Sequence, residues 1–293
     1  MSGTRVVRAV LVTDGRSHRL PAVLAALAAQ TTKVDFFHLH ILGDADSPEV
    51  PPALHAEVTW SPASTYAEGV ARVLFEHPAE SEDELLWLLH DDAAPAPDVL
   101  HRLEATARKR PRAAVIGAMH VRWDEPSRLV NVGTTVSRWG VRRVGLAAED
   151  DINQGQYDNK DDVLAVSLAG ALVSRVAWEA LGGLDEGYRG FGESVEFCRR
   201  VWAWGHDVVV VPTAKIRHAQ ESLYDRRSGG GLKRATHAQR RAGEWYHALT
   251  WAPVWAIPLL VLLLVPSAVA RAITRVMQNH PVLVAAELAV PFM

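Results

Sequence analysis

Short apolar runs alternate with amphipathic helical patterns over the first two thirds of the chain. Runs with the length of buried strands lie at 8–12, 36–42, 85–90, 113–119, 163–167 and 207–212. Between the first two runs, one helical face carries the apolar residues Leu20, Val23, Leu24 and Leu27. The segments 97–111 and 176–183 repeat the helical pattern. This alternation predicts an α/β domain at 1–225, with a sheet covered by helices.

The C-terminal part of the chain has a different pattern. An uncharged apolar stretch at 248–270 is long enough to cross a bilayer hydrocarbon core of about 30 Å. Prolines that would be costly in a buried core helix occur in it at Pro253, Pro258 and Pro266. Trp251 and Trp255 near one end suit a membrane interface. We therefore predict a transmembrane helix at 248–270, after a basic juxtamembrane segment at 226–247 and before an amphipathic or membrane-associated tail at 271–293.

Basic residues are distributed unevenly around the apolar stretch. Those before it are Arg226, Arg227, Lys233, Arg234, Arg240 and Arg241, and those shortly after it are Arg271 and Arg275. By the positive-inside rule, this asymmetry places the N-terminal domain on the cytoplasmic side of the cell membrane. The tail can also be buried by oligomerisation or by another membrane partner.

Composition excludes several classes of protein. The 293 residues are 48% hydrophobic and carry a formal net charge of -3, without the basic excess of a nucleic-acid binder. The single cysteine, Cys198, excludes a disulfide scaffold. We expect a globular domain in a reducing compartment that does not bind nucleic acid.

Candidate chemistry begins where the third apolar run ends, at His90, Asp91 and Asp92. Carboxylates at the C-terminal end of a strand lie at the sheet edge where open α/β sheets bind ligands. Adjacent carboxylates repel each other, and a divalent cation relieves that repulsion while it neutralises a diphosphate. The alternative is that the pair caps the helix that starts near Pro97.

A second group of polar residues lies at 181–222. Asp185, Glu193 and Glu196 occur among aromatic residues, where burial can raise a carboxyl pKa and prepare a general base. Glu193 and Glu196 are three residues apart and share one face of a helix. His218 follows a strand, and it becomes a candidate metal ligand only if the fold brings it to Asp92. The polar segments 147–162 and 224–234 are candidate lids, or else a solvated connector and a membrane-contacting linker.

The order of these motifs resembles family 2 glycosyltransferases of the GT-A fold over residues 5 to 222. The stretches that carry the resemblance are LVTDGRSHRLPAVLAALAAQT, ILGDADS, LLHDDAAPAPDVL and the long run AGALVSRVAWEALGGLDEGYRGFGESVEFCRRVWAWGHDVVVVPTAKIRH. The chain is most similar to a membrane-associated actinobacterial branch. The resemblance implies a mixed, mostly parallel sheet and transfer of a sugar from a nucleotide-diphosphate sugar to a cell-envelope glycan or polyprenyl-linked acceptor.

The resemblance also implies roles for individual residues. It assigns the nucleotide pocket to Thr13, Asp14 and Asp44, and the metal and diphosphate to Asp91 and Asp92. His218 matches a histidine that completes the metal site in some members. Further positions beside the donor sugar and acceptor are Ser167 and Gly170. An imidazole among oxygen ligands favours Mn²⁺ over Mg²⁺.

One position departs from the family pattern. Many relatives have Glu-Asp where this chain has Glu193 and Ser194, and the aspartate removes the proton of the acceptor hydroxyl. Serine cannot accept that proton at neutral pH, so we assign the base to Glu193, with Glu196 as the alternative, in an inverting reaction. A catalytically impaired nucleotide-sugar-binding scaffold and a glycoside hydrolase stay as other hypotheses. No GxGxxG follows the first strand, which disfavours a dinucleotide-binding dehydrogenase.

Overall fold

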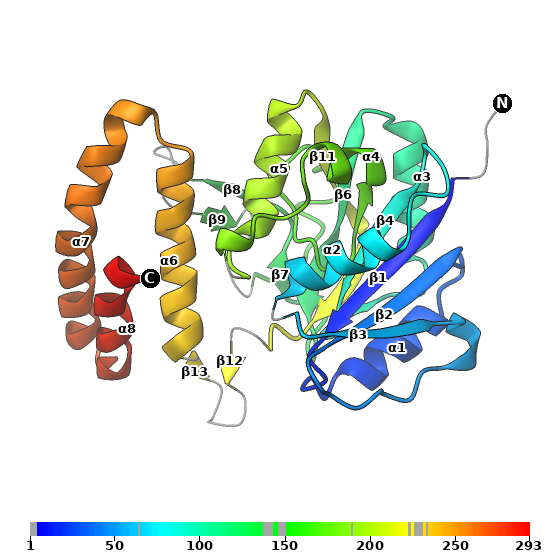
Figure 1. Cartoon of the computed structure of the whole chain (residues 1–293), viewed down its shortest axis with the longest axis horizontal. Helices are drawn as coiled ribbons and strands as arrows, with labels where there is room; N and C mark the ends of the chain where they lie inside the picture. Colours follow the sequence, from blue (N-terminus) through cyan, green and yellow to red (C-terminus); the bar gives the residue numbers. More distant parts are fainter. Residues whose placement is uncertain are drawn as a thin grey trace. The chain divides into compact units, whose positions relative to one another are not determined.

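The computed structural model describes residues 5–63, 65–136, 143–145, 151–188, 190–221, 224–225, 231–232 and 234–293. It contains two compact units (Figure 1). The first unit comprises the chain up to Thr135 together with Gly145–Asp185 and Ser194–Ala219. The second comprises Val136–Val144, Glu186–Glu193 and Gln220–Met293.

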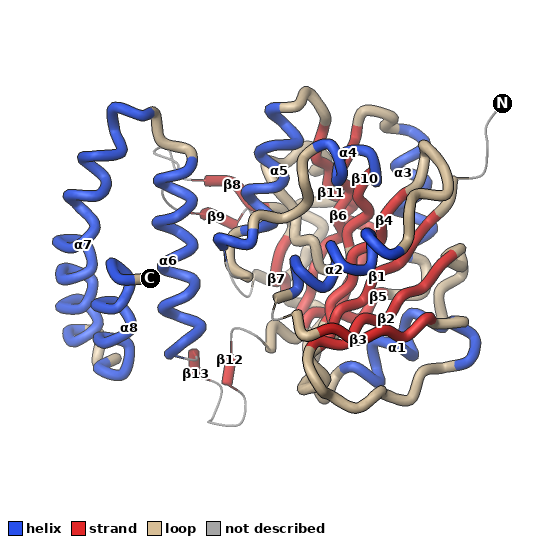
Figure 2. The backbone as a smooth tube through the Cα atoms, in the orientation of Figure 1, coloured by secondary structure: helices blue, strands red, loops and turns tan. Residues whose placement is uncertain are grey.

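The first unit is built on a nine-stranded mixed sheet in the order β3-β2-β1-β4-β10-β6-β11-β5, with β7 paired to β6 (Figure 2). The strands are β1 (Val7–Thr13), β2 (Phe36–Leu42), β3 (Glu57–Ser61), β4 (Leu85–His90), β5 (Ala93–Pro95), β6 (Ala113–Arg122), β7 (Leu129–Asn131), β10 (Ala171–Ser174) and β11 (Asp207–His218). β5, β7 and β10 run antiparallel to their neighbours, and the other pairs are parallel. β8 (Thr134–Val136) pairs with β9 (Arg143–Gly145) in a separate sheet.

Helices cover both faces of the sheet. α1 (Leu20–Ala28) and α3 (Val99–Lys109) pack on the face that includes Leu11, Leu39 and Leu89. The predicted apolar face of α1 is the buried one. α2 (Tyr66–Glu76) lies on the opposite face, where a Cβ on Gly69 would come within 2.7 Å of Val12. A capping box between Thr65 and Glu68 fixes the start of α2. α4 (Arg175–Ala180) and α5 (Glu193–Ala203) complete the set.

The strand predicted at 163–167 does not form. Among the described residues, Ala165 in this segment and Asp162 just before it form isolated bridges, to Thr134 and Val209 respectively. The chain instead turns at Gly170, which has a φ of 93° and donates its N–H to the carbonyl of Leu88 at 2.6 Å. β10 then enters the sheet antiparallel to β4 and β6. The left-handed turn, which glycine adopts without steric cost, explains why the strand starts later than predicted.

The second unit contains the helices α6 (Arg234–Thr250), α7 (Ile257–Met277) and α8 (Val284–Ala289). Short 3₁₀ turns are η2 (Glu186–Tyr188), η4 (Val254–Ala256), η5 (Pro281–Leu283) and η6 (Val290–Phe292), and β12 (Tyr224–Asp225) pairs with β13 (Gly231–Leu232). A buried carboxylate, Glu287, joins the helices. Its Oε1 lies 2.9 Å from Nε2 of His237 and 3.0 Å from Nε of Arg275.

One described helix, Val254–Met277, is long and apolar enough to cross a membrane by length and composition. Its best window has a mean hydropathy of 2.2 and is only 11% buried. It begins later than the predicted segment at 248–270 because α6 continues to Thr250 and Pro253 separates the two helices. Its end extends past Arg271 and Arg275.

Candidate metal centre

Strand pairing brings two distant segments together at the end of β4. β4 ends at His90, and β5 starts two residues after Asp91 and pairs antiparallel with β11, so that Ala93 faces His218. The carbonyl of Asp92 accepts the N–H of Ala219 at 2.9 Å. Asp92 and His218 are therefore held side by side by backbone hydrogen bonds, whatever their side chains bind.

The side chains of His90, Asp92 and His218 form a compact cluster. One ligand atom from each lies within 4.8 Å of the others, and Nε2 of His218 is 3.3 Å from Oδ1 of Asp92. Asp92 is buried, whereas both histidines are half-buried. Burial, reinforced by the nearby ring of His218 and opposed by Asp92, lowers the pKa of His90 to about 4. Its imidazole is thus neutral at neutral pH, the form that binds metals.

This donor set fits a divalent transition ion. Two imidazoles and one carboxylate with room for further ligands suit Mn²⁺, Fe²⁺ or Zn²⁺ better than Mg²⁺, which prefers oxygen ligands. His90 is the ligand that we did not predict from the sequence. The available signal was its place beside two aspartates at a strand end.

Asp91 is not part of the cluster. Its Oδ2 accepts a hydrogen bond from Thr13 Oγ1 at 2.6 Å, and its carbonyl accepts one from Ser17 Oγ at 3.1 Å. Adjacent residues after a strand point in different directions, so Asp91 ties the loop after β1 to the loop after β4. The structure thus groups the predicted ligands Asp92 and His218 with His90, and the role of Asp91 as a metal or diphosphate ligand stays a prediction.

The predicted nucleotide residues lie at the same edge of the sheet. β1 and β2 are parallel neighbours, with Thr13 beside Ile41 in register. A Cβ on Gly15 would be 2.6 Å from Cβ of Ala45, so the loops that carry Asp14 and Asp44 touch. Asp14 and Asp44 are exposed to solvent, and Thr13 is buried beneath them.

Ser167 and Gly170 lie at the turn before β10. The carbonyl of Gly170 accepts the indole N–H of Trp87 at 3.1 Å, and a Cβ there would be 2.2 Å from Cδ1 of Ile216. Ser167 Oγ accepts the N–H of Ala169 at 3.3 Å. These contacts give Gly170 a packing role behind the site. Ser167 is half-buried.

The two candidate bases occupy different environments on α5. Glu193 is buried at the first residue of the helix, and its Oε1 accepts the N–H of Gly190 at 2.8 Å. Both oxygens of Glu196 lie 2.6 Å from guanidinium nitrogens of Arg200, which also binds backbone carbonyls including that of Gly183. Glu196 is therefore engaged in a structural ion pair through both of its oxygens.

A second cluster, His38, Glu57 and His77, has metal-ligand composition but the wrong tautomer. Nε2 of His38 lies 2.8 Å from NH1 of Arg8, and a guanidinium only donates hydrogen bonds. The ring hydrogen must then be on Nδ1, the atom that faces Glu57 at 3.4 Å. Burial, with the neighbouring His77 and Arg8, lowers the pKa of His38 to about 3, consistent with a neutral ring. Nδ1 has no lone pair for a metal.

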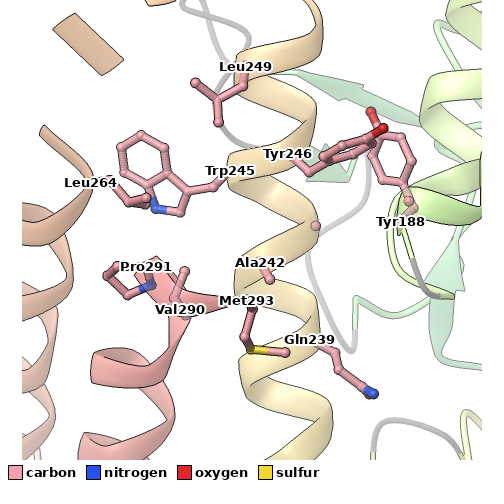
Figure 3. A pocket seen from close by; sticks show the side chains of 12 residues that line it. Tyr188, Gln239, Ala242, Trp245, Tyr246, Leu249, Leu264, Val290, Pro291 and Met293 are labelled. Atoms are coloured by element: carbon pink, nitrogen blue, oxygen red, sulfur yellow. The ribbon is translucent and has the colours of Figure 1, made fainter. Parts of the chain in front are cut away.

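The second unit contains an apolar cavity of about 160 Å³ beside α6 (Figure 3). Trp245, Leu249, Leu264, Val290, Pro291 and Met293 are among the residues that line it. Tyr188 reaches the same region of the unit, where its hydroxyl lies 3.2 Å from Nδ1 of His247 and its ring packs edge-on against Tyr246 at 4.8 Å.

The segments predicted as lids are only partly described. Residues 146–150, 222–223, 226–230 and 233 lie outside the described residues. At the end of the described part of the first segment, 151–162, Asp161 and Asp162 form ion pairs with Arg110 at 3.0 Å and 2.5 Å. These contacts hold the C-terminal end of that segment against α3.

Comparisons with known proteins identify a family from the sequence and a similar fold among solved structures. The model of the family "Glycosyltransferase like family 2" matches residues 7–228. GalNAc-T7, solved with UDP, GalNAc and Mn²⁺, has a similar fold with a TM-score of 0.57 and 11% identity, over 83% of this chain and 48% of that chain. The chain thus spans about half of that protein. The mannosyltransferase PcManGT from Pyrobaculum calidifontis, solved with GDP-Man and Mn²⁺, gives a TM-score of 0.56 and 13% identity over 99% of this chain and 87% of that chain. No curated protein sequence matches.

Proposed function

The chain belongs to glycosyltransferase-like family 2, and on this premise we propose that it transfers a sugar from a nucleotide-diphosphate sugar to a hydroxyl of a cell-envelope acceptor with the help of a divalent metal. It is a glycosyltransferase with the GT-A fold. The observation that carries the proposal is the cluster of His90, Asp92 and His218 at the sheet edge where open α/β folds bind ligands. The loops with Asp14 and Asp44 follow neighbouring strands at that edge.

We assign separate residues to binding of the metal and of the nucleotide. His90, Asp92 and His218 would hold the cation, and a bound cation neutralises charge that builds up on the departing diphosphate. Thr13, Asp14 and Asp44 would bind the nucleoside. Asp91 keeps its Oδ2 on Thr13 at 2.6 Å and so positions the nucleoside loop against the metal ligands.

The proposed reaction inverts the anomeric carbon. The acceptor oxygen bonds to that carbon from the face opposite the nucleotide, and the bond from the carbon to the phosphate oxygen breaks with its electrons going to the diphosphate. Glu193 takes the hydroxyl proton. Glu193 is preferred to Glu196 because Arg200 engages both oxygens of Glu196.

The acceptor side of the proposal depends on the second unit. The helix Val254–Met277 is about 36 Å long at 1.5 Å per residue, enough for a hydrocarbon core of about 30 Å. A membrane-bound enzyme of this kind meets acceptors that carry a lipid, such as a polyprenyl-linked glycan, and the cavity beside Trp245 offers apolar side chains to a small part of such a chain. The excess of basic residues before this helix favours a cytoplasmic location for the sugar-transfer domain.

Two other functions make different predictions. A scaffold that lost its base at Ser194 would bind a nucleotide sugar without consuming it. A glycoside hydrolase would need two carboxylates across a sugar and no nucleotide, whereas Asp92 is surrounded by histidines.

A screen of nucleotide sugars for thermal stabilisation, with and without Mn²⁺, tests the proposal. A ligand at one hundred times its Kd stabilises the folded state by about 2.7 kcal/mol, and we expect such a shift from one donor only when Mn²⁺ is present. Turnover of the same donor, measured as release of the nucleotide, distinguishes an enzyme from a scaffold that only binds the donor. Failure of every donor to stabilise the protein would contradict the proposal.

A further inference from the structure

A third histidine lies behind the metal cluster. His120 is fully buried in β6, whose parallel pairing with β11 places it beside Ile216 in register. Its Nδ1 is 2.9 Å from Nδ1 of His218, and the two rings meet edge-on with centroids 5.0 Å apart. His218 thus has one nitrogen on His120 and the other, Nε2, 3.3 Å from Asp92.

Two facing ring nitrogens at hydrogen-bond distance must share a single hydrogen when both rings are neutral. His120 is fully buried, and burial disfavours the charged form of an imidazole, so we take the ring as neutral. Either His120 donates to His218, or His218 donates to His120. Two lone pairs, or two hydrogens, would repel each other at this distance.

These two arrangements differ in what they allow at the metal cluster. If His120 donates, the hydrogen of His218 is on Nε2 and points toward Asp92, so that His218 cannot bind a metal. If His218 donates through Nδ1, its Nε2 presents a lone pair toward Asp92 and His90. Metal-binding histidines commonly donate their second N–H to a fixed acceptor, which orients the ring and selects the tautomer.

We propose that His120 is a positioning residue that selects the metal-binding tautomer of His218, and that cation binding moves the shared hydrogen from His120 to His218. The inference rests on the proposed metal-dependent function. The proton balance closes within the pair, because His120 loses the hydrogen on Nδ1 and gains one on Nε2, while His218 exchanges Nε2–H for Nδ1–H.

The surroundings of His120 support two accessible tautomers. Its Nε2 is buried and makes no well-formed hydrogen bond with any described residue, although the Ala169 backbone is near enough to raise the pKa of the ring. The Ala169 backbone therefore makes an Nε2–H accessible, but the lack of a well-formed hydrogen bond there favours Nδ1–H on His120 before a cation binds. A bound cation reverses that preference because it requires the lone pair of His218.

The test measures Mn²⁺ affinity of the full chain by the loss of the free Mn²⁺ electron paramagnetic resonance signal. His120→Leu removes the acceptor, and we expect it to weaken binding 10- to 100-fold. His120→Asn is the matched control, since its side-chain oxygen can take the place of Nδ1, and we expect affinity within a few fold of wild type. Equal affinity of His120→Leu and wild type overturns the inference. Absence of Mn²⁺ binding by the wild type overturns the metal-dependent function itself.

A spectroscopic measurement on the wild type does not depend on the stability of any variant. In protein labelled with ¹⁵N-histidine, we expect His218 to carry its hydrogen on Nε2 without metal and on Nδ1 after addition of Zn²⁺, used as a diamagnetic probe. If His218 already carries its hydrogen on Nδ1 before Zn²⁺ is added, no hydrogen moves on binding. That result contradicts the proposal.

Discussion

Replacing Glu193 with glutamine tests its role as the general base while the side chain keeps its shape and its hydrogen bond to Gly190. Oε1 of Glu193 accepts the N–H of Gly190 at 2.8 Å, and the glutamine carbonyl can keep that hydrogen bond. Glutamine cannot accept a proton at neutral pH, so the change removes the base while it keeps the hydrogen bond to Gly190. General-base catalysis contributes about 10²- to 10⁴-fold, and we expect kcat to fall by that factor, equivalent to about 3–5 kcal/mol of activation free energy.

Glu196→Gln is the matched control on the same helix. The side chain of Glu196 is 4% exposed and pairs with Arg200, whose side chain is 23% exposed. Loss of one charge from a buried pair costs about 3–5 kcal/mol, and partial exposure of Arg200 places this change near 3 kcal/mol. At about 2–4 °C per kcal/mol, Tm should fall by about 6–12 °C, while the folded variant keeps its kcat.

The assay is release of the nucleotide product under saturating donor and acceptor, with Tm measured on the same samples. Unchanged turnover in Glu193→Gln refutes the assignment of the base. Loss of turnover in Glu196→Gln at a temperature where the variant is folded would indicate that Glu196, and not Glu193, is the base.

Two further predictions concern stability. Gly170→Ala should lower the free energy of unfolding by about 3 kcal/mol, because φ is 93° and the new Cβ would be 2.2 Å from Cδ1 of Ile216. The control is Gly182→Ala, where φ is also positive, at 74°, but the new Cβ meets open space. Comparing the thermal unfolding of the two variants separates the steric clash from the backbone strain. The second prediction concerns pH. Burial lowers the pKa of His38 to about 3, so below pH 6.5 the unfolded chain binds a proton that the folded chain does not. The free energy of unfolding should therefore fall by about 1.4 kcal/mol for each unit that the pH is lowered between pH 6 and 4. His38→Gln, which can still accept from Arg8, should show a shallower dependence in chemical denaturation, and equal slopes would contradict the assignment.

Much of the fold follows from periodicity. The runs at 36–42 and 85–90 coincide with β2 and β4, and α1 buries the predicted face. These elements are long and their apolar residues recur regularly, so local pattern and tertiary burial agree. The run at 163–167 has the composition of a strand, but the turn at Gly170 delivers β10 to the sheet instead.

The site is harder to predict because it depends on pairing between distant segments. That Asp92 meets His218 follows from the antiparallel pairing of β5 with β11, and β5 has only three residues. His90 and His120 look like strand residues in the sequence, and their grouping appears only when β4, β6 and β11 are assembled. No local pattern carries that information. The sequence motifs single out His90, Asp92 and His218, but they assign no ligand role to His90 and do not single out His120.

The most direct test of the metal-dependent transfer is turnover of the stabilising nucleotide sugar in excess EDTA, followed by titration with Mn²⁺. We predict no transfer in chelator, full recovery with Mn²⁺, and little recovery in Asp92→Asn at the Mn²⁺ concentration that saturates wild type. Full activity of the wild type in excess chelator would contradict the assignment of His90, Asp92 and His218 as the metal centre.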